Sequence, residues 1–219
     1  NDNGNNGRTE LVFVVDRSGS MGGLESDTIG GFNSMLSKQR TIAGECRVTT
    51  LLFDHRIETL HNHLDIREVN DLTSRDYWVR GSTALLDAIG LAIDRMIVTQ
   101  RHTAAAYRAQ HVLFVIITDG YENASRRYSL HQIKQMITYE RERYHWEFVF
   151  LGANIDAEQT AGDFGISPRC ATDFHADGQG IKASFEAVAC AATAVRGGAD
   201  LEDLNAPDFL GGVRDDYRS

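Results

Sequence analysis

The chain has 219 residues, of which 42% are hydrophobic and 24% charged, a composition typical of a globular protein with one sizeable core. Its formal net charge of −9 argues against a general affinity for nucleic acid, because phosphate binding requires clustered lysine and arginine. No apolar run is long enough to cross a bilayer. The chain begins at Asn1 and not at methionine, so the lack of a recognisable signal peptide proves little about targeting.

The first quarter of the chain alternates polar and apolar segments. Residues 1–8 are polar and glycine-rich, and we expect them to be disordered. A continuously apolar segment at 10–16 predicts a strand buried on both faces. Apolar residues at helical spacing then predict an amphipathic helix that ends near Gly44. Two strands follow, at 46–54 and 56–64, and their connection is too short for a crossover, which predicts an antiparallel hairpin at a sheet edge.

The rest of the chain continues the alternation of strands and helices. Ser129 and Gln132 have the spacing of a capping box, which marks the start of one helix. The tail, 197–219, is rich in glycine and aspartate, and its scattered apolar residues leave open whether it docks on the body or hangs free. Apolar periodicity predicts helices at 83–98, 129–144, 155–163 and 179–195 and strands at 110–120, 146–154 and 169–174.

This order of elements predicts a three-layer α/β fold. The central sheet is expected to be mostly parallel, with one antiparallel edge strand and with helices on both faces. In such sheets ligands bind at the carboxyl ends of the strands. Asp16 and Asp119 each end an apolar strand, so both carboxylates are expected at that edge.

A set of oxygen-bearing side chains follows the same strand ends. Ser18 and Ser20 alternate after Asp16 through a glycine turn, and Thr83 lies where a loop enters a helix. No histidine or cysteine joins them, so zinc is disfavoured and Mg²⁺ is favoured, with Mn²⁺ and Ca²⁺ as alternatives. The predicted metal ligands are Asp16, Ser18, Ser20, Thr83 and Asp119. A polar turn without metal is the alternative interpretation of Asp-x-Ser-x-Ser by itself.

The motif Asp-x-Ser-x-Ser after the first strand, with a later threonine and a Thr-Asp-Gly after the fourth strand, resembles the von Willebrand factor A (vWA) domain. The resemblance covers 9–196 and implies a Rossmann-like fold with a complete metal-ion-dependent adhesion site (MIDAS). It implies that Ser18 and Ser20 bind the metal directly and that Asp16 binds directly or through water. "FLGANIDA" and "YWVRGSTALLDAIG" are similar to bacterial stand-alone members, which often partner with AAA+ ATPases.

Several other residues are expected near the metal edge. Trp78, Arg80, Tyr121 and Glu122 are predicted to form a partner-binding rim, because aromatic and arginine side chains are favoured at binding hot spots. For Trp78, packing under its loop is an equal alternative. Asp54 either orients a group at the site or caps the hairpin turn, and the turn is favoured.

Histidines and cysteines are interpreted as structural. His61 and His63, with His55 and Asp65 nearby, have the spacing for a second metal site, but the polar side of an edge strand is the favoured interpretation. The cysteines are widely spaced and form no CxxC pair, which predicts three reduced thiols in a cytoplasmic protein: Cys46, Cys170 and Cys190.

The leading functional hypothesis is a non-enzymatic module in which the metal binds an aspartate or glutamate of a protein partner. A metal-assisted hydrolase is one alternative, although the motif supplies no general base. A structural metal site in an assembly partner of an AAA+ ATPase is another. No nucleic acid and no membrane span are expected.

Overall fold

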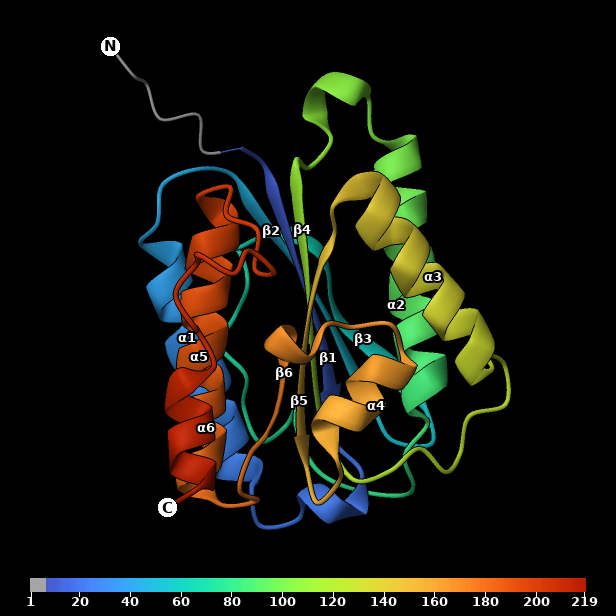
Figure 1. Cartoon of the computed structure of the whole chain (residues 1–219), viewed down its shortest axis with the longest axis vertical. Coiled ribbons are helices and arrows are strands. Elements are labelled where there is room, and N and C mark those ends of the chain that lie inside the picture. The colour runs from blue at the N-terminus through green and yellow to red at the C-terminus, as the bar shows by residue number, and fades with distance from the viewer. Residues whose placement is uncertain (1–6) are drawn as a thin grey trace.

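The computed structural model describes residues 7–219 and contains a six-stranded sheet in the order β3-β2-β1-β4-β5-β6 (Figure 1). Neighbouring strands are parallel except β3, which pairs antiparallel with β2 at one edge. Residues 1–6, part of the segment expected to be disordered, lie outside the described residues. The strands are β1 (Thr9–Asp16), β2 (Cys46–Phe53), β3 (Ile57–Asp65), β4 (His111–Asp119), β5 (Glu147–Ala153) and β6 (Ala171–Asp173).

Helices cover both faces of the sheet (Figure 1). On one face lie α1 (Glu25–Arg40), α5 (Gly178–Arg196) and α6 (Gly211–Tyr217), and on the other lie α2 (Leu85–His102), α3 (Leu130–Tyr144) and α4 (Ala157–Asp163). Short 3-10 turns occur at Gly19–Met21, Ala105–Tyr107 and Pro168–Cys170. The predicted fold class, a mostly parallel sheet between two helical layers with one antiparallel edge strand, is confirmed.

The central strands are apolar because both of their faces are covered. Every residue of β1 is buried, and so is every residue of β4 after His111. Burial of this apolar surface on both sides is the main driving force that holds the layers together. It also fixes the ends of β1 and β4 side by side, since the two strands pair in parallel from Thr9 with His111 to Val15 with Ile117.

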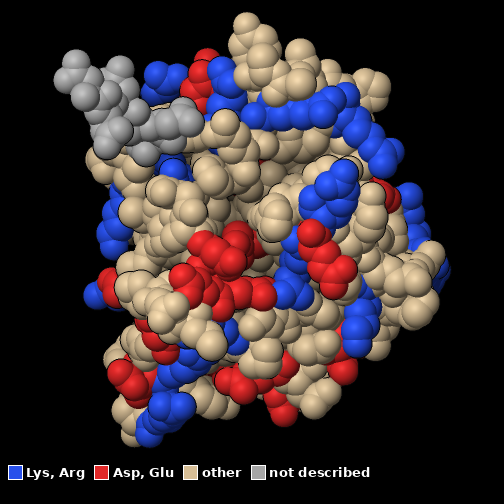
Figure 2. Space-filling model, turned by 45° about the horizontal axis from the view of Figure 1, so that its top comes forward, with Lys and Arg blue, Asp and Glu red and all other residues tan. Residues whose placement is uncertain are grey.

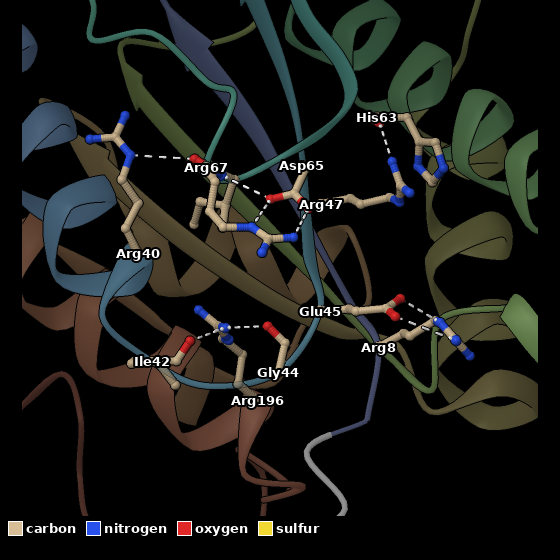
Figure 3. Close-up of polar contacts among 11 residues, drawn as sticks. Arg8, Arg40, Ile42, Gly44, Glu45, Arg47, His63, Asp65, Arg67 and Arg196 are labelled. Atoms are coloured by element: carbon tan, nitrogen blue, oxygen red, sulfur yellow. Dashed lines mark hydrogen bonds and ion pairs between the residues drawn. The ribbon is translucent and has the colours of Figure 1, made fainter.

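Two helix boundaries differ from the sequence prediction. The first helix ends at Arg40 and not near Gly44. The turn that follows is held against α5 by hydrogen bonds from the Arg196 side chain to its backbone carbonyls (Figure 3). The Arg196 side chain is 2% exposed and donates to the carbonyls of Gln39 and Ile42 at 2.6 and 2.9 Å. The second helix continues to His102, because its last turn is polar and the apolar pattern marks only its buried part. The capping box at Ser129 is present as predicted.

The hairpin of β2 and β3 corrects the interpretation of the histidines. His61 is 6% exposed, so it does not lie on the polar side of the edge strand; its Nδ1 is 3.0 Å from the Thr50 hydroxyl and its ring stacks on Phe32. The pairing of β2 with β3 is irregular here, and His63 has a φ of 54° and lies 2.8 Å from Glu10. The two rings therefore have different partners. Within residues 7–219 no three His, Cys, Asp or Glu residues are grouped as metal ligands.

Arginine side chains connect the hairpin of β2 and β3 and the chain before β1 through hydrogen bonds and an ion pair (Figure 3). Arg67 donates to Asp65 at the end of β3, and Arg47 donates to the carbonyl of His63. Arg8 pairs with Glu45 at 2.5 Å, which fixes the chain just before β1 to the loop before β2. These contacts hold the amino ends of the strands.

The tail packs on the body of the protein. Leu201, Leu210 and Val213 are buried, and Arg214 on α6 donates to the carbonyl of Ala171 at 3.2 Å. Leu204, in contrast, is 84% exposed. None of the helices in the described part of the chain is long and apolar enough to span a membrane. The three cysteines form no disulfide; Cys46, Cys170 and Cys190 are free, the first two buried and the last exposed.

Candidate metal-binding site

Three loops meet at the carboxyl edge of the sheet, at the bottom of Figure 1. The amide of Gly19, in the loop after β1, donates to the carbonyl of Gly81 at 3.1 Å. The loop of Gly81 continues to Thr83, whose amide donates to Asn123 Oδ1 at 2.9 Å, and Asn123 returns a bond to the Thr83 carbonyl at 3.0 Å. Asn123 belongs to the loop after β4. These bonds bring to one edge the predicted ligands Asp16, Ser18, Ser20, Thr83 and Asp119.

Asp16 is fully buried and tightly held. Its Oδ1 accepts from the amide of Ser18 at 2.6 Å, and its Oδ2 accepts from the Thr118 hydroxyl at 2.8 Å and the Asp119 amide at 3.2 Å. Burial raises the pKa of Asp16, while these hydrogen bonds oppose the rise. Each carboxylate oxygen offers two lone pairs, so Oδ1 retains capacity for a cation or a water.

The two serine hydroxyls lie together beside Asp119. Ser18 Oγ and Ser20 Oγ are 3.0 Å apart, and the Ser20 hydroxyl donates to the Asp119 carbonyl. Gly120 has a φ of 126°, a conformation that L side chains rarely adopt, and a Cβ there would lie 3.6 Å from Ser20 Oγ. Glycine after β4 therefore permits the turn that places this loop against the serines.

Asp119 and Thr83 each have one side-chain oxygen that forms no hydrogen bond within the described residues. Oδ1 of Asp119 accepts from the Asn154 side chain at 2.5 Å, whereas its Oδ2 and the Thr83 hydroxyl have no hydrogen bond to any residue in 7–219. Burial raises the pKa of Asp119, and the Asn154 hydrogen bond opposes this rise. Hydroxyl and carboxylate oxygens are hard donors that suit Mg²⁺, Mn²⁺ or Ca²⁺, so the residues present fit a divalent cation.

A buried ionic network lies behind these loops. Asp54 is fully buried and accepts from the Arg56 amide at 2.7 Å, which is the predicted cap of the hairpin turn. The same carboxylate also accepts from Arg17 Nε at 3.2 Å and Arg80 Nε at 2.8 Å. Burial would raise the pKa of Asp54, but the bonds from Arg80 and Arg56 and the charge of Arg17 outweigh it, and the pKa is lowered.

Trp78 is partly packed and partly exposed. The residue is 42% exposed, and the guanidinium groups of Arg80 and Arg17 lie over its ring, 4.4 and 5.4 Å from the ring centre. Arg17 is only 1% exposed, so it supports the loop from within. The neighbouring Tyr77 is also buried and donates through its hydroxyl to the Asp16 carbonyl at 2.6 Å. The Arg80 guanidinium is one-third exposed, anchored through Nε at the surface.

The other two rim candidates lie in the loop after β4. Tyr121 is 61% exposed, and its hydroxyl accepts a long bond from the amide of Asp156 at 3.4 Å. Both carboxylate oxygens of Glu122 are engaged by the protein: they accept from the amides of Leu86 and Ala124 at 2.9 and 2.8 Å, and from Ser125. Glu122 thus orders this loop and the start of α2, while Tyr121 presents its ring to solvent.

Three further residues shape the site: Thr118 holds Asp16, Asn123 holds Thr83, and Asn154 holds Asp119. Sequence reasoning expected Asn123 near the metal edge without this role, and it missed Asn154. Asn154 directly follows β5, so the signal that located Asp16 and Asp119, a polar residue at the end of an apolar strand, also applies to it. Thr118 is the threonine of the Thr-Asp-Gly motif, and Asn123 lies in the loop that follows this motif.

No protein-family model and no curated protein sequence matches the chain. Solved structures of similar fold include proximal thread matrix protein 1 from the mussel byssus, with a TM-score of 0.56 and 15% identity over 85% of this chain and 46% of that one. The chain thus spans about half of the mussel protein. A crystal form of that protein has a zinc-occupied MIDAS motif.

Two further structures have a similar fold. The von Willebrand factor domain of the pilus tip protein Mfa5 from Porphyromonas gingivalis has a TM-score of 0.57 and 12% identity, over 85% of this chain and 95% of that one. Manganese-loaded TRAP from Plasmodium vivax has a TM-score of 0.54 and 15% identity, over 82% and 72% of the two chains. The fold of the chain is therefore that of a vWA domain.

Proposed function

We propose that the chain is a non-enzymatic, metal-dependent protein-binding module. A divalent cation held by Asp16, Ser18, Ser20, Thr83 and Asp119 binds an aspartate or glutamate side chain of a partner. The observation that carries the proposal is the set of oxygens from three loops at one edge, of which the Thr83 hydroxyl and Asp119 Oδ2 have no hydrogen-bond partner in residues 7–219. The zinc and manganese in structures of similar fold support a divalent cation.

The charge of the ligand set supports a carboxylate as the partner group. Hydroxyls carry no charge, and the two carboxylates at most balance a divalent ion. Mg²⁺ keeps several waters when protein ligands are few, and an incoming carboxylate can replace one of them. The surrounding exposed side chains, Trp78, Arg80 and Tyr121, then provide contacts that select the partner. AAA+ ATPases are a partner class that the resemblance implies.

Catalysis is the weaker candidate. Hydrolysis by a metal-bound water needs a general base within hydrogen-bond reach. Within residues 7–219, the other side chains that hydrogen-bond to the proposed ligands are Tyr77, Thr118, Asn123 and Asn154, and none of these takes up a proton at neutral pH. This composition favours binding over turnover.

The test is thermal unfolding in EDTA and then in Mg²⁺, Mn²⁺ or Ca²⁺. A cation that binds only the folded state stabilises it by about 2.7 kcal/mol at a hundredfold excess over Kd, so the wild-type midpoint rises. Thr83→Ala is the sharpest variant, because the Thr83 hydroxyl has no hydrogen bond to the described residues. It should unfold like the wild type in EDTA and show a smaller rise with metal. Ser34→Ala, an exposed hydroxyl on α1, is the matched control.

A second arm tests the partner group. With metal present, a peptide with a single aspartate should raise the midpoint further, and the same peptide with asparagine should not. A wild-type midpoint that no ion moves, with or without the aspartate peptide, would contradict the metal site. A metal response with no difference between the two peptides would keep the metal and contradict its role in binding acidic partners.

A further inference from the structure

A cavity lies at the end of the molecule opposite to the metal edge. It has a volume of about 180 Å³ and lies where α2 and α3 end and where the chain enters β4 and β5. Figure 2 brings this end toward the viewer, and both acidic and basic side chains gather on it. The cavity is lined chiefly by Ile97, Arg101, Arg108, Glu140, Tyr144 and Trp146.

Glu140 gives the cavity a buried acid. The residue is 3% exposed, and its carboxylate has no hydrogen bond or ion-pair contact with any residue in 7–219. Burial raises the pKa of Glu140, and the charge of Arg101 opposes this from beyond contact distance. Neither carboxylate oxygen is among the fully buried atoms of the described chain, so the group faces the cavity it lines. A cationic group that enters the cavity can therefore pair with this carboxylate.

Two arginines, Arg101 and Arg108, place positive charge in the lining of the same cavity. Arg108 donates through Nε to the carbonyl of Thr103 at 2.9 Å, which fixes its position, and its terminal nitrogens form no hydrogen bond to residues 7–219. Arg101 lies on the last turn of α2, is exposed, and has no hydrogen bond to the described residues. A guanidinium with free N–H groups recognises a carboxylate in two-point geometry.

Aromatic and aliphatic side chains complete the lining of the cavity. Trp146 is 6% exposed and stacks on Phe114 with ring centres 5.6 Å apart, so its ring is held in place. The backbone positions it beside the acid: His145 takes the left-handed conformation after α3, and the Trp146 amide donates to the Glu140 carbonyl at 3.3 Å. Ile97 adds aliphatic surface. An apolar body between a cationic and an anionic group matches this lining.

We infer that this cavity binds a small zwitterion, an amino acid with an apolar side chain. Its ammonium group pairs with Glu140, its carboxylate with Arg101 and Arg108, and its side chain packs on Trp146 and Ile97. The volume of about 180 Å³ is below the roughly 300–1,000 Å³ of pockets that hold drug-sized ligands, which suits a ligand as small as an amino acid. The metal edge takes no part in this site.

The experiment is isothermal titration of the full chain with L-leucine and L-phenylalanine. Two analogues separate the charges: leucinamide lacks the carboxylate, and N-acetyl-leucine lacks the ammonium group. We expect at least one amino acid to bind and each analogue to bind at least tenfold more weakly than leucine. Chemical shifts of backbone amides at the ends of α2 and α3 should move on binding, which locates the site.

Two variants at neighbouring acids complete the design. Glu140→Gln keeps the shape of the side chain, removes its charge, and should weaken amino-acid binding at least tenfold. Glu142→Gln, two residues on and exposed, should leave binding unchanged. An unchanged thermal response of both variants to metal reports that they are folded. No binding of either amino acid, equal binding of leucine and leucinamide, or undiminished binding by Glu140→Gln would each overturn the inference.

Discussion

The two ends of the molecule each bury an arginine, but they balance its charge differently. At the metal edge, Arg17 is 1% exposed and pairs with the carboxylates of Asp54 and Glu58. At the opposite end, Arg196 is 2% exposed and binds backbone carbonyls, among them those of Gln39 and Ile42. Removing Asp54 from the first network leaves the buried Arg17 with only the exposed carboxylate of Glu58, whereas removing the cation from the second leaves only neutral dipoles without partners.

Asp54→Ala should therefore have the largest effect on stability. The substitution leaves Arg17 and Arg80 without their shared partner, and breaking a buried ion pair in this way costs about 3–5 kcal/mol. Urea unfolding measures this loss. Metal affinity should fall as well, because the Arg80 amide donates to the Arg17 carbonyl at 2.9 Å and so links the two loops of the site.

Glu58→Ala is the control for this comparison. Glu58 pairs with the same Arg17 but is 55% exposed, and exposed pairs contribute about 0–1 kcal/mol. If Asp54→Ala costs no more than Glu58→Ala, burial of the anion does not govern the stability of the metal edge.

Arg196→Met should have a smaller effect and should separate stability from binding. The methionine fills part of the same space but leaves the carbonyls after α1 without donors, at a cost of about 2–3 kcal/mol. Because the substitution lies at the end away from the metal edge, the Kd for Mg²⁺ should not change. Both quantities can be taken from unfolding curves measured across a metal titration, with Arg143→Met, an exposed arginine, as control. A changed Kd would mean that the two ends are coupled through α5.

Structural features that depend on neighbouring residues could be predicted from the sequence, whereas the partners of the two buried arginines could not. Apolar runs that end in Asp16 and Asp119 were enough to place two strands and the edge that carries the polar loops, whereas the direct pairing of these two strands was not predicted. The capping box at Ser129 placed a helix start for a local reason. Such features depend on a few neighbouring residues, so pattern and propensity determine them.

The partners of the buried arginines depend on residues far apart in the chain. Arg17 lies in a polar turn, where an arginine is ordinarily solvated, and its burial requires Asp54 on a different strand end. Arg196 directly follows the helix predicted at 179–195, and nothing local indicated the carbonyls after α1. Asn154 and the tail helix α6 are similar cases, because their roles arise only when the sheet is assembled.

Several charged groups surround one acid, Glu147, at the amino ends of the strands. This residue is the first of β5 and lines the same hollow as Asp200 and Glu202 of the tail. Burial, and then the charges of Asp200 and Glu202, raise the pKa of Glu147 to about 7, against the bond from the Leu201 amide and the charge of Arg141. Glu202 itself pairs with Arg141. The other titratable groups around the same hollow are His111, Glu142 and His145.

Glu147→Gln should change the free energy of unfolding less than Asp54→Ala or Arg196→Met does, and its effect should depend on pH. The folded state keeps the Glu147 proton up to about pH 7, whereas the unfolded chain loses it near its ordinary pKa of 4.5. The folded state therefore binds more protons in this window, and stability falls as pH rises from about 4.5 to 7 and is level above it. With allowance for solvent screening, the loss is on the order of 1–2 kcal/mol. Urea unfolding from pH 4.5 to 8.5 should show the variant gaining stability over the wild type as pH rises, while Glu142→Gln tracks the wild type. If the difference in free energy of unfolding between variant and wild type stays constant over this range, Glu147 is ionised in the folded protein throughout. The charges of Asp200 and Glu202 then do not raise the pKa of Glu147.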